Sequence, residues 1–295
     1  MSKRWLPIFV VAILGLMVIP LVTGCGESTT TTAGPTSTTE SGEEVGPTGP
    51  NAEAADQAIA ALTKSPDIES PKTITAGKVQ AGSDTTYPPF EFSDGKGGYI
   101  GFDIDMMAAI CKKMGLELVV VPTAWDGIIP ALVSDRFDVI ISAMSITAER
   151  KEQINFTDPY YKNDLAITTP VDKPIKNADE LVGKVVGVQV DTTGQFAIEK
   201  IEGIKDIKKY ETIIAALQDL QVGRTDAVVN DEPSNAYQIL NIPELANTGT
   251  IPVDDDYGFG IKKENEELLA AVNQALKELK EEGVYDLIRT KWFGK

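Results

Sequence analysis

The apolar positions of the chain begin as one unbroken run. Residues 6–22 are almost wholly apolar, and the basic pair Lys3 and Arg4 precedes them. A basic start, an apolar stretch and a small residue at the cut are typical of a secretory signal, which is removed on export. The pattern therefore predicts that residues 1–24 are a signal peptide and that the folded protein is extracytoplasmic.

The end of this run separates a cleaved signal from a membrane-spanning helix. About 20 apolar residues can cross a bilayer, so a span is the alternative interpretation. Two prolines lie inside the run, however, and its end, VTGC at 22–25, resembles a bacterial lipobox. That resemblance implies that Cys25 is lipidated and anchors the mature chain to the outer face of the cell membrane or on its periplasmic side.

A polar tract separates the signal from the body of the chain. After Cys25, residues 26–50 are almost entirely Thr, Ser, Gly, Pro and Glu. Such a composition buries too little apolar surface to offset the entropy lost on ordering, so we expect 25–50 to be a lipidated cysteine and a disordered linker. Residues 51–69 form a short N-terminal extension, and their Ala-rich part at 51–63 favours a helix.

Short apolar runs of strand length alternate with helical periodicity through the rest of the chain. A turn is expected at 87–89 and a hairpin at 94–98. The pattern predicts strands at 78–83, 116–121, 137–142, 184–189, 207–210 and 226–230, and helices at 103–114, 128–133, 194–201, 212–222 and 264–282. Strands that alternate with helices imply an α/β fold with mostly parallel sheets and covered faces.

The helix at 103–114 has boundary signals at both ends. Asp103 is placed to cap its N-terminus, and Gly115 is placed to end it. Cys111 falls on its apolar side, where a cysteine packs as a small core residue. If Cys25 carries lipid, Cys111 has no partner, so no internal disulfide is expected.

The composition excludes several functional classes. The chain of 295 residues has no histidine, and it carries 27 Lys and Arg against 44 Asp and Glu. Without histidine there is no Ser-His-Asp or Cys-His nucleophile and no imidazole metal site. The net charge of -17 argues against nucleic acid as a partner, because phosphate binding needs clustered Lys and Arg.

The glycine and acidic motifs supply no cofactor or metal site. The glycines near residue 97 follow a hairpin pattern and not a nucleotide fingerprint. The run Asp254-Asp255-Asp256 lacks the alternation and the distal Glu of a calcium loop, so it is predicted to be a solvated loop. We therefore expect neither a cofactor nor a metal.

Four segments, in this order along the chain, resemble the bacterial extracellular solute-binding proteins (family 3 type) that serve polar amino-acid ABC transporters. The resemblance covers roughly residues 70–295, and the ending KWF at 291–293 is similar too. The segments are GSDTTYPPFEF at 82–92 with GFD at 101–103, WDGIIPAL at 125–132, DVIISAMSITAER at 138–150 with FTDPY at 156–160, and GRTDAVVND at 223–231.

The resemblance implies the type II periplasmic-binding-protein fold. In that fold two α/β lobes, joined by two crossover hinge strands, close on a ligand in the cleft between them. Carried onto this chain, lobe 1 comprises 70–167 and 252–295, and lobe 2 comprises 168–251. The apolar segments 166–169 and 250–253 are the hinge candidates. Open α/β sheets generally bind ligands at such strand ends.

The resemblance also assigns residues to the α-carboxylate of an amino acid. Arg150 is the expected carboxylate partner, because its fork matches two oxygens; a solvated Arg is the alternative. Ser145 would add its hydroxyl, and the loop at Thr192 and Thr193 would close over the carboxylate with backbone N–H groups. The family commonly has Gly before this Thr pair, whereas this chain has Asp191, a departure that bears on the loop geometry.

The α-ammonium is assigned to the opposite lobe. Asp231 follows an apolar strand and would pair with the ammonium, although it could instead cap the following helix. The carbonyl of Ala143 would accept a hydrogen bond from the same ammonium, and the adjacent Met144 is included in the binding segment.

The ligand side chain would lie between two aromatic rings. Tyr87 and Trp125 occupy the family's pocket positions, with core packing as the alternative. Asp84 lies at the pocket base, and Glu91 and Gln189 are further candidates. An acidic ligand would need a second cation in the pocket, and no pocket position supplies one. A cationic ligand (Arg, Lys or His) is therefore expected first and Gln next.

The function implied is capture of a free polar L-amino acid and its delivery to an ABC permease, by a monomer without catalytic residues. A dehydratase acting on cyclic carboxylic acids is the alternative on the same fold. It would keep Arg150 but need a general acid where Asp231 lies. A sensor domain is a third possibility, but no signalling domain follows Lys295.

Overall fold

The computed structural model describes residues 52–294. The predicted signal peptide, the lipidated Cys25 and the linker lie outside the described residues, so they stay predictions. Within the described part, no helix combines the length and the apolar character that crossing a membrane requires.

The first sheet is built by strands from both ends of the body. In spatial order it contains β5 (Glu117–Pro122), β1 (Lys78–Ser83), β6 (Val139–Ile140), β13 (Gly260–Ile261) and β7 (Asn155–Phe156). Strand β1 pairs in parallel with β5 and β6, whereas β13 runs antiparallel to β6 and β7. The predicted parallel pairing is therefore confirmed for β5, β1 and β6. Strand β13, which comes from the C-terminal part of the chain, runs antiparallel to its neighbours.

The second sheet repeats this plan. Its order is β10 (Asp206–Tyr210), β9 (Val185–Gln189), β11 (Ala227–Asp231), β8 (Tyr161–Pro170) and β12 (Leu245–Tyr257). Strand β9 pairs in parallel with β10 and β11, while β8 runs antiparallel to both β11 and β12. A third, small sheet is formed by β2 (Thr86–Tyr87), β3 (Glu91–Ser93) and β4 (Tyr99–Ile100), and the predicted hairpin at 94–98 joins β3 to β4.

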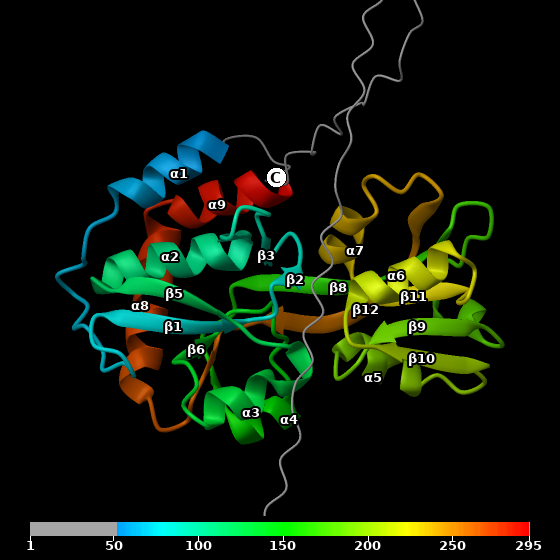
Figure 1. Cartoon of the computed structure of the whole chain (residues 1–295), viewed down its shortest axis with the longest axis horizontal. Helices are drawn as coiled ribbons and strands as arrows, with labels where there is room; N and C mark the ends of the chain where they lie inside the picture. The colour runs from blue at the N-terminus through cyan, green and yellow to red at the C-terminus, as the bar shows by residue number, and fades with distance from the viewer. Residues whose placement is uncertain (1–51, 295) are drawn as a thin grey trace, which may run out of the picture. The chain divides into compact units, whose positions relative to one another are not determined.

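Helices cover both faces of the first sheet (Figure 1). Val139 and Ile141 point to the core shared with α2 (Phe102–Met114), whereas Ile140 between them packs with α3 (Ile128–Val133). This alternation follows from the two-residue period of a strand. The other helical segments here are η1 (Trp125–Gly127), α4 (Ala148–Gln153), α8 (Glu266–Glu281) and α9 (Val284–Phe293).

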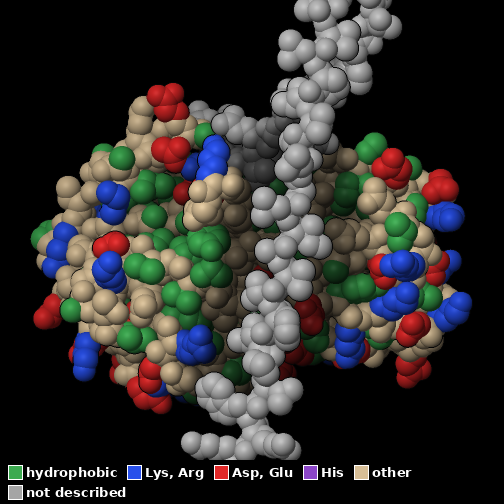
Figure 2. Space-filling model, viewed as in Figure 1, with side chains coloured by type: hydrophobic (Ala, Val, Ile, Leu, Met, Phe, Trp, Pro, Cys, Tyr) green, Lys and Arg blue, Asp and Glu red, His purple; other side chains and the backbone are tan. Residues whose placement is uncertain are grey.

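The second sheet is covered in the same way. Val228 packs toward α6 (Ile213–Gln221), and its neighbours Ala227 and Val229 pack toward α5 (Thr193–Glu199). Two further segments, η2 (Ala178–Leu181) and α7 (Glu232–Gln238), complete this lobe. On the face drawn in Figure 2, basic and acidic side chains are interspersed over both lobes, so the acidic surplus is not gathered in one patch of that face.

The long strands β8 and β12 link the two sheets. They pair with one another from Tyr161 opposite Tyr257 to Pro170 opposite Leu245, with irregular register between Ile251 and Asp255. The hinge candidates at 166–169 and 250–253 both fall within these strands. Two α/β lobes joined by two strands are the predicted fold class, which the structure confirms.

The start and end of α2 test the boundary signals. Gly115 ends the helix in the left-handed conformation with φ 73°, as predicted. The cap assigned to Asp103 is wrong, because the helix begins at Phe102 after Gly101. The Asp103 carboxylate is instead buried and accepts hydrogen bonds from the Ala143 N–H and the Tyr160 hydroxyl, both at 2.8 Å.

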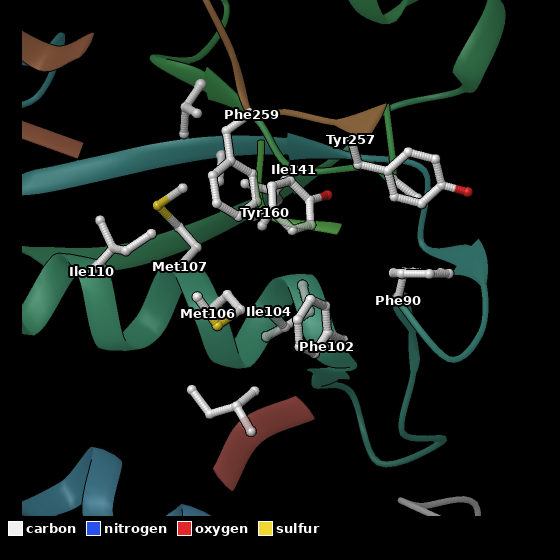
Figure 3. Packing of buried hydrophobic residues seen from close by; sticks show 14 of the residues in the cluster. Phe90, Phe102, Ile104, Met106, Met107, Ile110, Ile141, Tyr160, Tyr257 and Phe259 are labelled. Atoms are coloured by element: carbon white, nitrogen blue, oxygen red, sulfur yellow. The ribbon is translucent and has the colours of Figure 1, made fainter. Parts of the chain in front are cut away.

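Aromatic rings from several segments pack together in the hydrophobic core that includes α2 (Figure 3). The rings of Tyr160 and Phe259 stack with their centroids 4.2 Å apart, and Phe90 meets Tyr257 edge-on at 5.3 Å. Phe90 lies between β2, which carries Tyr87, and β3, and Tyr257 ends β12, so this cluster packs the crossing strand against that part of the small sheet.

The N-terminal extension packs against the first lobe. Its predicted helix is α1 (Ala52–Ala61), which lies against α9. The Lys291 ammonium is held between Asp56 of α1, at 2.6 Å, and Asp105 of α2, at 2.8 Å. The extension is therefore tied to the last helix by an ion pair as well as by the buried side chains of Ala55 and Ile59.

Candidate ligand-binding site

A cavity of about 310 Å³, counting its part open to solvent, lies between residues of the two lobes. All the predicted ligand-binding residues except Met144 line it, and Ser142 lines it in addition. The lining residues are Asp84, Tyr87, Glu91, Trp125, Ser142, Ala143, Ser145, Arg150, Gln189, Thr192, Thr193 and Asp231. The structure thus brings the predicted set together, and their contacts with a ligand stay a prediction.

Arg150 is buried in this cavity and not solvated, with 7% of its surface exposed. Its helix α4 begins after Thr147, whose hydroxyl caps the Arg150 N–H. The guanidinium donates to the carbonyls of Ser145 and Asp191, both at 2.9 Å, and lies 5.0 Å from the centre of the Trp125 ring. Burial lowers the pKa of Arg150, while the negative charge of Asp255 opposes that shift. These contacts leave its remaining N–H donors for an anion.

Asp191 occupies the position where the family commonly has glycine. Its φ is 57°, in the left-handed region that glycine adopts freely and that Asp tolerates better than most residues. This conformation directs its carbonyl to Arg150 and to the Trp125 indole N–H, which donates at 3.3 Å. The departure in sequence therefore leaves a loop that still reaches across to the other lobe.

Asp231 ends β11, and its carboxylate lies inside the cavity. The residue occupies the N-cap position of α7, but its side chain makes no capping bond, so the capping interpretation is not supported. Its carboxylate instead accepts hydrogen bonds from the Tyr87 hydroxyl and from the Asn163 amide at 2.7 Å. Burial raises the pKa of Asp231, and these bonds oppose that shift. Tyr87 thereby connects the first lobe to the second.

Two more carboxyl groups line the cavity. Asp84 accepts hydrogen bonds from the Thr86 hydroxyl at 2.8 Å and from the Gln189 amide at 3.4 Å. Glu91 is fully buried and accepts a bond from the Ser142 hydroxyl at 2.8 Å. Burial raises the pKa of Asp84 and, with the charge of Asp103, raises that of Glu91 well above its usual range.

The charges of the cavity do not balance. Among the described residues that line it, Asp84, Glu91 and Asp231 are acidic, and only Arg150 is basic. Buried carboxylates are costly unless a cation or several donors pair with them. A ligand that carries positive charge would complete the site.

The two threonines of the second lobe have different roles. Thr192 caps α5 by accepting from the Gln195 N–H at 3.2 Å, and its hydroxyl donates to the Gln189 carbonyl at 2.8 Å. The Thr193 hydroxyl donates to the Asp255 carboxylate at 2.9 Å. The Thr192 side chain therefore shapes the loop, and the Thr193 side chain faces the strand that links the lobes.

Asp255 was missed by the sequence reasoning, and the prediction of a solvated loop at 254–256 is wrong. These residues lie in β12, where Asp255 is only 5% exposed. A signal in the sequence could have found it. Val253, Asp255 and Tyr257 are spaced two residues apart, so in a strand their side chains lie on the same face, and Asp255 then shares a face with two apolar residues. The run of three acids concealed that alternation.

Met144 was predicted to line the cavity but does not, whereas Ser142, for which the sequence suggested no role, does. Ala143 has a φ of 43°, and the Met144 side chain after it packs in a small core with Ile128 and Leu132 and not in the cavity. Ser142 follows β6 and links Glu91 to the backbone N–H of Asp84, which donates to its hydroxyl at 3.0 Å. A hydroxyl just after a central strand was the available signal for Ser142.

Two lobes on paired crossing strands, with a charged cavity between them, define a solute-binding protein of the two-lobed class. Residues 79–295 match the model of the bacterial extracellular solute-binding proteins, family 3. The chain belongs to this family.

Curated relatives and solved structures agree with that assignment. The chain is 37% identical over 227 residues to the lysine/arginine/ornithine-binding periplasmic protein of Escherichia coli K12, covering 73% of this chain and 87% of the relative. It is 36% identical to the arginine-binding periplasmic protein of Mannheimia haemolytica, covering 71% and 88%. An ancestral arginine-binding protein bound to arginine is similar in structure, with a TM-score of 0.71 and 40% identity over 74% of this chain and 99% of that one.

Proposed function

We propose that this protein binds a free L-amino acid with a cationic side chain and delivers it to an ABC permease. The observation that carries the proposal is the charge imbalance of the cavity, where three acids face one base among the described lining residues. An amino acid brings one carboxylate and one ammonium, which take Arg150 and Asp231. Asp84 and Glu91 then remain; burial raises the pKa of Glu91 and favours its neutral form, so Asp84 is the group assigned to a second positive charge.

The α-groups are assigned to residues that are already oriented. Arg150 is fixed by two carbonyls and the Trp125 ring, so its free edge is preorganised for a carboxylate. Asp231 is fixed by Tyr87 and Asn163 at the other side of the cavity. Such an arrangement satisfies both ends of an α-amino acid once its water is removed.

The side chain of the ligand would extend toward Asp84 and Glu91. Gln189 lies within 3.4 Å of Asp84 and adds an amide that can contact a guanidinium or another amide. Most of the relatives' names support a cationic ligand, because they include lysine, arginine, ornithine and histidine, while one relative is named for L-cystine. Glutamine is the second candidate, since an ancestral arginine-binding protein of 40% identity is also known bound to glutamine.

The cellular setting follows from the family. Its members are extracellular, and periplasmic proteins are among the relatives. We further infer that Cys25 carries a lipid anchor, that the linker at 25–50 lets the folded part reach its permease, and that the protein acts as a monomer. The lobe boundaries at 70–167 with 252–295 and at 168–251 belong to the same proposal.

We assign no catalytic role to the cavity. A solved structure of 38% identity is an ancestral amino acid-binding protein that preceded cyclohexadienyl dehydratase, so the fold is compatible with such chemistry. Asp231 held by both Tyr87 and Asn163 supports a fixed ammonium partner and not a mobile general acid. Incubation with cyclic carboxylic acids should leave them unchanged, as judged by absorbance and mass.

The test is a thermal-unfolding screen of residues 51–295 against the twenty amino acids, after unfolding and refolding to remove any ligand acquired during expression. A ligand at about 1,000 times its Kd adds about 4 kcal/mol of stability, so the shift is large. Arginine, lysine or histidine should produce the largest shift. A shift with none of the twenty would overturn the proposal, and a shift with glutamine alone would correct its choice of ligand.

A further inference from the structure

Asp255 lies between the two lobes and connects them through one carboxylate oxygen. This Oδ2 accepts hydrogen bonds from the Ser145 hydroxyl at 2.8 Å and from the Thr193 hydroxyl at 2.9 Å. Ser145 follows β6 in the first sheet, and Thr193 begins α5 on the second. Both donors line the ligand cavity, whereas Asp255 itself belongs to β12, one of the two strands that join the lobes.

The residue paired with Asp255 in the adjacent strand performs a matching task. Asp255 lies opposite Asn163 in the β8–β12 ladder, at the end of its irregular stretch. The Asn163 amide donates to the Asp231 carboxylate at 2.7 Å. One pair of facing residues on the two linking strands therefore holds Asp231 at one side of the cavity and Ser145 with Thr193 at the other.

Ser145 shows why this connection bears on the carboxylate end of the site. Its hydroxyl is held by Asp255, and its carbonyl accepts from the Arg150 guanidinium at 2.9 Å. The Arg150 guanidinium also reaches the Asp191 carbonyl in the second lobe. The orientation of Arg150 thus depends on a loop whose position Asp255 sets from the linking strand.

We propose that Asp255 is a positioning residue that couples closure of the lobes to ligand binding. It draws hydroxyls from both lobes onto one buried carboxylate when the cleft closes. This inference rests on the proposed function, since it concerns closure on the same ligand.

The physical reason is an asymmetry between the closed and the open molecule. When the lobes separate, Asp255 cannot keep donors that belong to different lobes, and a water molecule must replace one of them. That water also donates to the ionised carboxylate, so the gain on closure comes from releasing the ordered water and from the lower dielectric of the closed cleft, where a hydrogen bond to a charged acceptor is stronger. A ligand that holds the lobes together benefits from this gain.

The experiment compares Asp255→Asn with Asp254→Asn in residues 51–295. Asp254 is the matched control, because it lies next to Asp255 on the same strand and its side chain is 96% exposed. Calorimetry and stopped-flow measurements with arginine should show about tenfold weaker affinity for Asp255→Asn, mainly through faster dissociation. The control should match the wild type in both quantities.

Two further measurements separate positioning from a general loss of structure. Combining Asp255→Asn with Thr193→Val should weaken binding by little more than the stronger single change, because Asp255→Asn weakens and Thr193→Val removes the same hydrogen bond. Small-angle scattering of the ligand-free protein should show a larger radius of gyration for Asp255→Asn than for Asp254→Asn.

The failures of this inference and of the proposed function are distinguishable. If the wild type binds no amino acid, the proposed function fails, and the scattering comparison alone decides on Asp255. If the wild type binds but the two Asn variants agree in affinity, dissociation rate and scattering, the role given to Asp255 is wrong. Full additivity of the Asp255 and Thr193 changes would equally overturn it.

Discussion

Removal of the Arg150 side chain tests the carboxylate end of the site most directly. The guanidinium is buried, donates to two carbonyls at 2.9 Å and stacks on Trp125. In Arg150→Ala a bound amino acid would present a carboxylate to a cavity whose remaining described charges are negative. Losing one partner of a buried charge pair costs about 2–4 kcal/mol, because the other charge stays unpaired. This corresponds to a loss of affinity between about thirtyfold and several hundredfold.

The assay is titration calorimetry of the refolded protein with arginine and with agmatine, which lacks the α-carboxylate. The loss caused by Arg150→Ala should be large for arginine and nearly absent for agmatine, since only arginine presents the group that Arg150 binds. Lys151→Ala is the control, because it removes one positive charge from the exposed next residue. Arg150→Lys should fall between, because it keeps the charge and loses the fork.

Two results would refute this reasoning. Binding of arginine that stays within threefold of the wild-type value would show that Arg150 does not carry the carboxylate. Equal losses for arginine and agmatine would show that Arg150 acts only by holding the Ser145 and Asp191 carbonyls in place. The melting temperature of each ligand-free variant separates either result from a loss of folding.

The remaining predictions concern the other charges and the indole ring. Trp125→Ala should weaken binding of all ligands by roughly 3- to 30-fold, because the ring stacks on Arg150; calorimetry that shows a loss for arginine with glutamine spared would instead place the ring against the ligand side chain. Asp84→Asn should reduce the affinity for arginine by at least tenfold more than the affinity for glutamine. An equal reduction for both ligands would show that Asp84 does not recognise the ligand side chain. Affinity for arginine should fall as the pH drops from about 7 to 5. Burial raises the pKa of Asp231, whose ionised form would pair with the ammonium, and burial also raises the pKa of Asp255, to about 6, whose ionised form holds the Ser145 and Thr193 hydroxyls. Over the same fall in pH, the stability of the ligand-free protein should rise, because Asp231 and Asp255 bind protons more readily in the folded state than in the unfolded chain. Calorimetry at pH 7 and pH 5 tests the expected fall in affinity, and thermal melts of the ligand-free protein test the expected rise in stability.

Local periodicity was sufficient for the sheet strands and covering helices that the sequence analysis predicted, although it did not find the helices α4, α7 and α9. Strand β1 and helix α3 have the predicted bounds, and α6 differs by one residue at each end. Each of these elements buries apolar side chains in a core, so the spacing of its apolar residues has the period of the strand or helix that it forms. The termination of α2 was predictable for the same local reason, because Gly115 adopts the left-handed conformation that ends a helix.

The linking strands could not be predicted as reliably. Strand β12 mixes buried, partly exposed and exposed positions along its length, and its order comes mainly from pairing with β8. Such long-range pairing has no signature within either segment. Asp103 illustrates the same limit: its position suits a helix cap, but the partners that settle its role, Ala143 and Tyr160, lie about 40 and 57 residues away.

The site residues were predictable to the extent that they follow strand ends. Asp84 follows β1, Ser145 follows β6, and Asp231 ends β11. The carboxyl ends of parallel strands meet at one edge of a sheet, so segments distant in sequence converge there. The sequence could place these residues at an edge, but it could not show that Tyr87 reaches Asp231 or that Arg150 reaches the Asp191 carbonyl across the cleft.

Those contacts across the cleft explain how a pair of separately folded lobes can recognise one small molecule. In the proposed site each lobe would supply one charge for the α-groups, Arg150 from the first and Asp231 from the second, so that neither lobe alone would satisfy both ends of an amino acid. Binding energy therefore depends on closure, and closure depends on the strands that join the lobes. Asp255 and Asn163 lie opposite each other on those strands and hold residues of the cavity wall, so the linking strands are part of the recognition site as well as the hinge.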